Sequence, residues 1–118
     1  MPRLVRLPEP VGCVDDLRGT WARRSAELGW AFPTDWHSPS VDAVCEALAE
    51  RRDVRAAGER LGRERAAAGV SLAEALTDID ALAESVPAHA EALGRAVSLG
   101  WADRAAAPAD AVSDALTG

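Results

Sequence analysis

The chain has 118 residues, which is enough for one domain with a modest core, and 48% of them are hydrophobic, as in globular rather than disordered proteins. Its net charge is −6, and all 13 of its basic residues are arginines. Because a nucleic-acid-binding protein needs an excess of cationic side chains to displace counterions from phosphates, this balance argues against nucleic acid as a partner.

The first thirty residues predict an extended arm followed by a helix. Residues 1–10 contain three prolines and two arginines, a composition that favours an extended chain. Beyond this arm, apolar residues recur at spacings of three, four and seven, as on one face of a helix. These residues are Val14, Leu17, Trp21 and Leu28. Gly29 then provides a C-terminal stop.

Residues 29–39 form the one long loop that the sequence predicts, and this loop is rich in rings. The rings belong to Trp30, Phe32, Trp36 and His37. We expect them to close an open end of the core, since tryptophan is highly buried on average. Two other interpretations stay open. The loop is then either a lid over a pocket for a small apolar or heterocyclic ligand, or a contact between two copies of the chain, because tryptophan is enriched at interfaces.

Two helices are predicted between residues 38 and 69. A serine, either Ser38 or Ser40, caps the first of them. Its apolar face comprises Val41, Val44, Cys45 and Leu48. The polar run 49–52 then indicates either one long helix that bends near Asp53 or, as we prefer, two helices with Asp53 as the second cap. Gly58 and Gly62 lie one turn apart and allow another helix to approach closely.

The C-terminal half predicts two more helices. Ser71 and Glu74 have the spacing of a capping box, in which each side chain bonds the backbone amide of the other residue. The apolar stripe that comes next, as far as Pro87, consists of Leu72, Leu76, Ile79, Leu82 and Val86. Another helix is expected over residues 88–104. Its inward residues are Leu93, Ala96, Val97, Gly100 and Trp101.

No sustained alternation of apolar and polar residues and no hairpin dipeptide competes with these helices. The sequence therefore predicts an all-α fold, an antiparallel bundle of four to five helices over residues 11–107. An extended N-terminal arm (1–10) and one long aromatic-rich loop complete it. We expect residues 108–118 to form a short linker helix that leads out of the bundle.

The last five residues, Asp114-Ala115-Leu116-Thr117-Gly118, resemble the opening of a GGDEF domain, the family whose active members make cyclic di-GMP from GTP. In that family the pentapeptide lies where a signalling helix meets the catalytic domain. The resemblance implies that this chain is the N-terminal regulatory region of a bacterial signalling protein and that a GGDEF-like domain comes after it. The Gly-Gly-Asp/Glu-Glu-Phe sequence of the family does not occur in this chain.

Active GGDEF domains work as dimers, so the resemblance also implies a homodimer in which this module sets how two output domains face each other. The residues predicted to form the dimer interface are Leu93, Val97, Trp101, Val112 and Leu116. Two other functions stay open. One is a small-molecule-sensing domain with the Trp30–His37 loop as its lid, and the other is a module that docks a different protein through the arginine-rich segment 51–65.

The sequence predicts no catalytic residue, cofactor or metal site. Its two histidines and two cysteines lack the paired spacing of metal ligands, and it contains no serine elbow or phosphate-binding glycine loop. Glu74, Asp78 and Glu84 lie off the apolar stripe of their helix, so we expect them in solvent. We expect the arginines of segment 51–65 there too, with Glu59 and Arg63 spaced as an i,i+4 ion pair.

The sequence also favours a reduced, cytoplasmic protein. Cys13 and Cys45 are too few and too isolated for a disulfide framework, and each lies near an apolar residue, where a free cysteine behaves as a small hydrophobic side chain. No apolar run has the length needed to cross a bilayer, and the N-terminus lacks the apolar centre of a signal peptide. We therefore expect no membrane contact.

Overall fold

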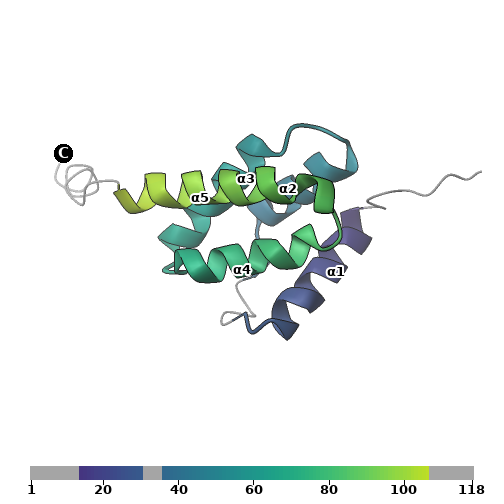
Figure 1. The fold of residues 1–118 in the computed structure, drawn as a ribbon, viewed down its shortest axis with the longest axis horizontal. Coiled ribbons are helices and arrows are strands. Elements are labelled where there is room, and N and C mark those ends of the chain that lie inside the picture. Colours follow the sequence, from purple (N-terminus) through teal and green to yellow (C-terminus); the bar gives the residue numbers. More distant parts are fainter. Residues whose placement is uncertain (1–13, 31–35, 107–118) are drawn as a thin grey trace, which may run out of the picture.

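A computed structural model describes residues 14–30 and 36–106, which form five α-helices and no strand (Figure 1). The helices are α1 (Val14–Glu27), α2 (Pro39–Ala49), α3 (Arg55–Ala67), α4 (Leu72–Ala83) and α5 (Ala90–Ala106), and a short 3-10 turn, η2 (Pro87–His89), precedes α5. The predicted all-α architecture is confirmed. The predicted arm (1–10) and linker helix (108–118) lie outside the described residues.

The helix ends depend on the local sequence. Ser38 caps α2, because its hydroxyl accepts a hydrogen bond from the backbone amide three residues on, at 3.3 Å. Ser71 and Glu74 form the complete capping box at the start of α4. Gly29 and Gly69 have φ angles of 98° and 87°, in the left-handed region that favours glycine, and they terminate the segments that contain α1 and α3.

The polar run after α2 separates two helices, as the preferred interpretation predicted. Arg51 turns the chain with a φ of 59°, which is uncommon for a residue other than glycine. The N-cap residue of α3 is Val54 and not, as we predicted, Asp53. The carboxylate of Asp53 still accepts a hydrogen bond from the backbone amide of Arg55 at 2.9 Å, so it satisfies a free donor in the first turn of α3. Val54, between them, is buried in the core.

Helices α3 and α5 touch through their backbones. Gly62 and Gly100 leave no room for a side chain: a Cβ atom on Gly62 would overlap the carbonyl oxygen of Val97, and one on Gly100 would overlap that of Glu59. Gly58 is also buried on this side of α3, where a Cβ would lie 2.7 Å from the Cβ of Ala96. The close approach predicted from the glycine spacing in α3 is therefore present, with α5 as the partner helix.

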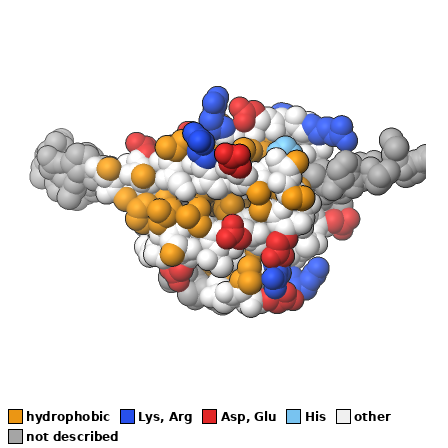
Figure 2. Space-filling view, in the orientation of Figure 1, with side chains coloured by type: hydrophobic (Ala, Val, Ile, Leu, Met, Phe, Trp, Pro, Cys, Tyr) orange, Lys and Arg blue, Asp and Glu red, His pale blue; other side chains and the backbone are white. Residues whose placement is uncertain are grey.

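All five described helices contribute to one hydrophobic core. Helix α4 runs antiparallel to α5, to which η2 connects it, whereas α1 lies inclined to both (Figure 1). The largest fully buried side chains are Trp21, Leu48, Leu61, Ile79, Leu82 and Leu93. Hydrophobic side chains also reach the surface along the line where α4 and α5 meet (Figure 2). The half-buried residues of these two helices include Leu72, Leu76 and Trp101.

Candidate functional site

The most unusual feature of the interior is a buried carboxylate on α4. The side chain of Asp78 is 1% exposed, and its two oxygens accept three hydrogen bonds. Ser25 of α1 donates to Oδ1 at 2.6 Å, and the indole of Trp36, just before α2, donates to the same oxygen at 2.8 Å. Arg65 of α3 donates from Nη2 to Oδ2 at 3.3 Å and supplies the opposite charge. One side chain thereby connects four segments of the chain.

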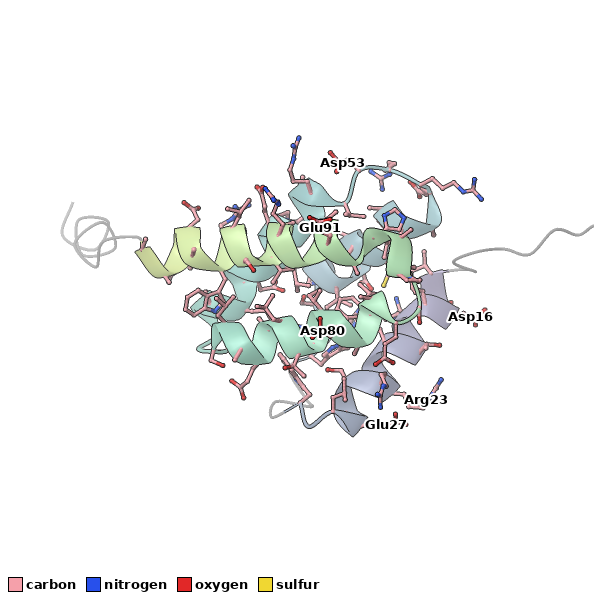
Figure 3. All side chains as sticks on the ribbon, in the orientation of Figure 1. Asp16, Arg23, Glu27, Asp53, Asp80 and Glu91 are labelled. Atoms are coloured by element: carbon pink, nitrogen blue, oxygen red, sulfur yellow. The ribbon has the colours of Figure 1, made fainter. Side chains whose placement is uncertain are left out.

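The expectation that Asp78 faces solvent is wrong, and so is the same expectation for Arg65, which is 3% exposed. Helix α4 packs against α5 on one side and against α1 on the other, so its buried face is wider than the stripe of large apolar residues. Asp80, two residues further along, is the acid on α4 that does face solvent (Figure 3). Asp78 is stable in the interior because three donors, one of them the cation Arg65, replace its hydration.

A signal for this site exists in the sequence. Ala75, Asp78 and Leu82 recur at i, i+3 and i+7, which places the acid on an apolar face of the helix. Leu61 and Arg65 share a face of α3 in the same way, at i and i+4. A charge in such a stripe indicates burial only when a counter-charge lies on the facing helix, and the sequence alone does not pair helices.

Three tryptophans surround the ion pair. Trp21 is fully buried, and its indole nitrogen donates to the backbone oxygen of Asp78 at 2.8 Å. Its ring meets that of Trp36 edge to face, with centroids 5.0 Å apart. The guanidinium of Arg65 lies over the ring of Trp30, with its central carbon 4.7 Å from the ring centroid. The aromatic rings and the charges therefore form one unit.

The predicted aromatic loop divides between two environments. Trp36 is buried and completes the core, as we expected for this loop, and Trp30 is half-buried against it. His37 lies at the edge of this unit. Its ring stacks on that of Trp36, with centroids 6.4 Å apart, but its side chain is 57% exposed and lies 2.9 Å from a carboxylate oxygen of Asp42. Phe32 lies outside the described residues.

His37 also belongs to a surface cluster that joins α1 to α2. The hydrogen bond with His37, together with a second one from Arg18 at 2.9 Å, holds the pKa of the Asp42 carboxyl below its usual range. Arg18 also contacts Asp15 one turn earlier in α1. The cluster therefore fixes the start of α2 against α1, and the stacking of His37 on Trp36 connects it to the rings around the buried ion pair.

A pocket of about 160 Å³ opens beside the buried carboxylate, between the end of α1 and the first half of α4. Its lining is mostly apolar, with few polar groups, as is usual for small-molecule sites. Ser25, Leu28, Gly29 and Trp30 form one side, and Ala73, Glu74, Thr77 and Asp78 form the other. Of the four residues predicted for a ligand site, the structure places Trp30 in the wall of this pocket.

Two of the five residues predicted for the dimer interface lie in the core of one chain. Leu93 and Val97 are 0% exposed within one chain, because they face the core shared by α3 and α4, so they have no surface to offer a second copy. Trp101 is half-buried, and its indole nitrogen donates to the backbone oxygen of Val70 at 2.8 Å. Val112 and Leu116 lie outside the described residues.

Cys45 is a buried core residue in α2. Burial raises the pKa of its thiol to about 12, so it is almost entirely protonated at neutral pH. Within residues 14–30 and 36–106, no three His, Cys, Asp or Glu side chains are placed to hold a metal ion. None of the helices in these two ranges combines the length and the apolar composition needed to span a membrane.

Comparisons with protein-family models, with curated proteins and with solved structures find no match for this chain. We therefore infer its function from the geometry of the molecule and from the sequence pattern at its C-terminus.

Proposed function

We propose that this chain is a non-catalytic regulatory and dimerisation module of a bacterial signalling protein, and that it positions a GGDEF-like domain located after residue 118. The observation that carries the proposal is the contact between α3 and α5. A helix whose backbone meets that of its neighbour at Gly62 and Gly100 cannot slide without moving the bundle. The resemblance of residues 114–118 to the opening of a GGDEF domain supports the identity of the output domain.

Helix α5 is a suitable element for transmission. Residues 102–106, its last described turn, are exposed, and this end extends beyond the other helices (Figure 1). The half-buried Trp101 anchors the helix one residue earlier, through its hydrogen bond to Val70. The bundle therefore holds α5 between Leu93 and Trp101 and leaves its C-terminal end available to direct the chain after it.

The dimer forms through the surface where α4 and α5 meet, which we call the α4–α5 seam and define by Leu72, Leu76 and Trp101. These three residues are half-buried within one chain, and hydrophobic side chains gather along this line (Figure 2). Continuous apolar surface of this kind marks interaction sites in soluble proteins. When the two-fold axis of the dimer runs along α5, a second copy on the seam brings the C-terminal ends of the two α5 helices side by side.

Light scattering on the purified chain tests the dimer. We expect a mass of two 12.4 kDa chains for the wild type and of one chain for Leu76→Arg, because burial of the seam between two copies would remove the hydration of the added cation. Leu99→Arg is the matched control. Leu99 is 52% exposed on α5, and two residues along a helix turn by about 200°, so it faces away from Trp101. A wild-type mass of one chain, or equal effects of both variants, would contradict the proposed seam.

The output domain is tested in the gene and in the full-length protein. We expect the reading frame after Gly118 to continue into a GGDEF-like sequence. In the full-length protein, Leu76→Arg should lower the formation of cyclic di-GMP, whereas Leu99→Arg should leave it unchanged. A stop codon directly after residue 118 would refute the regulatory role, and so would an output that Leu76→Arg does not alter.

A second function, the sensing of a small molecule, is favoured by the pocket between α1 and α4. Trp30 lines this pocket and also contacts Arg65 of the buried ion pair, so a bound molecule would touch the network that connects four segments of the chain. A screen of metabolites by tryptophan fluorescence tests this function. If the chain senses a small molecule, at least one compound should change the tryptophan emission of the wild type. A screen in which no compound changes the emission would argue against this function.

A further inference from the structure

We propose that the pocket between α1 and α4 selects a small organic cation, such as a protonated amine or amidine on a compact ring. This inference rests on the second proposed function, the sensing of a small molecule, and it names the class of molecule that is sensed. Three properties of the described residues lead to it: the direction of the hydrogen bonds in the wall, the charge of the wall and the size of the space.

The hydroxyl groups of the pocket have no proton left to donate. Ser25 donates its hydroxyl proton to Asp78 at 2.6 Å, and Thr77 donates its own to the backbone oxygen of Ala73 at 3.0 Å. Each hydroxyl has one proton and two lone pairs, so what remains on both is acceptor capacity. A ligand that enters this space gains hydrogen bonds if it brings N–H donors, and it gains none from these hydroxyls if it brings only acceptors.

The carboxylates add acceptors and a negative charge. Asp78 is neutralised by Arg65, with which it shares the hydrogen bond behind the pocket. Glu74 accepts from the backbone amide and the hydroxyl of Ser71 through one oxygen, and within residues 14–30 and 36–106 it makes no ion pair with an arginine or histidine. The wall therefore carries one negative charge that no described cation balances, and it attracts a positively charged ligand.

The space fits one ring. The pocket measures about 160 Å³, and an apolar cavity of about 150 Å³ is known to bind benzene in another protein. Leu28, Trp30 and Ala73 supply apolar surface for such a body, and the acceptors of Glu74 and Thr77 lie on the α4 side. A ring that carries one amine or amidine group can pack against the apolar residues and donate hydrogen bonds to the acceptors.

The experiment uses three probes of similar shape and different charge: benzamidine, benzyl alcohol and benzoate. Two-dimensional amide NMR of the ¹⁵N-labelled chain monitors the signals of Gly29 and Thr77, which lie on opposite sides of the pocket. We expect benzamidine to shift both signals and to bind at least about tenfold more tightly than the neutral alcohol, with benzoate weaker still. Equal or tighter binding of the alcohol or of benzoate would overturn the selection for a cation and leave the sensing function standing.

Three variants separate the site from the rest of the surface. Ala73→Leu fills the pocket from an exposed position of α4 with a good helix former, so it should abolish the shifts and preserve the melting temperature. Glu74→Gln keeps the capping box, which accepts glutamine, and removes the charge, so it should weaken benzamidine about tenfold. Glu91→Gln, on the exposed first turn of α5, is the matched control and should bind like the wild type (Figure 3).

The outcomes distinguish this inference from the two proposed functions. If no probe shifts Gly29 or Thr77 in the folded wild type, the inference is refuted, and the sensing function loses its site. If Ala73→Leu binds benzamidine as tightly as the wild type, the ligand lies elsewhere, and the pocket is refuted. Neither result changes the mass of the chain in light scattering, so the dimer proposal is decided separately.

Discussion

Among the residues that the structure describes, Asp78 and Arg65 are the charged side chains that lie buried. Taking two charges out of water costs several kcal/mol for each ion, and only good geometry with further hydrogen bonds offsets this cost. Here Ser25 and the indole of Trp36 complete the shell of the carboxylate, and the ring of Trp30 covers the guanidinium. The pair is therefore sensitive to the loss of either member, because the remaining charge stays buried.

The substitution Asp78→Asn tests how much the buried ion pair contributes to stability. Asparagine keeps the size and some of the acceptor capacity of the side chain, but it removes the counter-charge of Arg65. We expect the free energy of unfolding to fall by roughly 3–5 kcal/mol, measured by urea denaturation with detection by circular dichroism. Asp80→Asn, two residues along the same helix but exposed, should change it by less than about 0.5 kcal/mol. Similar losses for both variants would mean that the buried charge pair does not control stability.

Among the elements, α3 and α5 form the closest contact. Glycines on both helices bring backbone against backbone, so the packing of this pair has no flexible side chain that could adjust. Helix α4 has a different relation to its neighbours, because it presents large apolar residues to the core and a charge to α1 and α3. The described helices thus have a rigid contact between α3 and α5 and a buried polar junction at Asp78.

Two alanine substitutions test the rigid contact, because one should lower the free energy of unfolding and the other should raise it. Gly62→Ala places a methyl group against the carbonyl oxygen of Val97 and forces the helices apart, so the free energy of unfolding should fall by about 1–3 kcal/mol or more. Gly94→Ala, also within a helix but with nothing within 4 Å of the new Cβ, should raise it by roughly 0.5–1 kcal/mol. Thermal denaturation measures both. A Gly62→Ala variant as stable as Gly94→Ala would show that α3 and α5 can separate at little cost.

At the scale of the whole molecule, the described helices share one core, and the reactivity of Cys45 shows whether that core is closed. This thiol is fully buried among apolar residues contributed by several helices, and burial raises its pKa to about 12. At pH 8 about one thiol in ten thousand is then a thiolate, the form that reacts with disulfide reagents. A reagent therefore reaches Cys45 efficiently only when the core opens.

Labelling of Cys45 tests whether the bundle opens as a unit. In a Cys13→Ser variant, which leaves Cys45 as the only thiol, we expect a chromogenic disulfide reagent to label the folded chain at pH 8 as slowly as the chain unfolds globally. In denaturant the thiol should react at once. Complete labelling of the folded chain within minutes would contradict cooperative opening and would indicate that α2 separates from the other helices locally.

Much of the fold was predictable because its signals are local. The caps at Ser38 and Ser71 and the break at Asp53 each depend on residues a few positions apart, and the structure confirms all three. The closeness of α3 and its partner was likewise predictable from the spacing of Gly58 and Gly62. Hydrogen bonds within one turn and the steric freedom of glycine need no knowledge of the rest of the chain.

The candidate site was much less predictable. A ligand site at the aromatic loop was an alternative to core completion. The structure places one of its four candidates, Trp30, in the pocket wall, whereas His37 belongs to a surface cluster with Asp42. Asp78 and Arg65 were both expected in solvent, although they form the centre of the site. The burial of a charge depends on which helix faces it, and a residue 13 positions away in the chain supplies that partner.

The sequence by itself determined that this chain is helical, where two of its helices are capped, and which glycines permit close packing, since these properties result from short-range hydrogen bonding and apolar periodicity. Only the tertiary structure decided which polar residues lie inside, that Leu93 and Val97 belong to the core of one chain, and that a pocket opens beside Asp78. The physical reason is that burial and electrostatic pairing are properties of facing surfaces, and the chain creates those surfaces only when it folds.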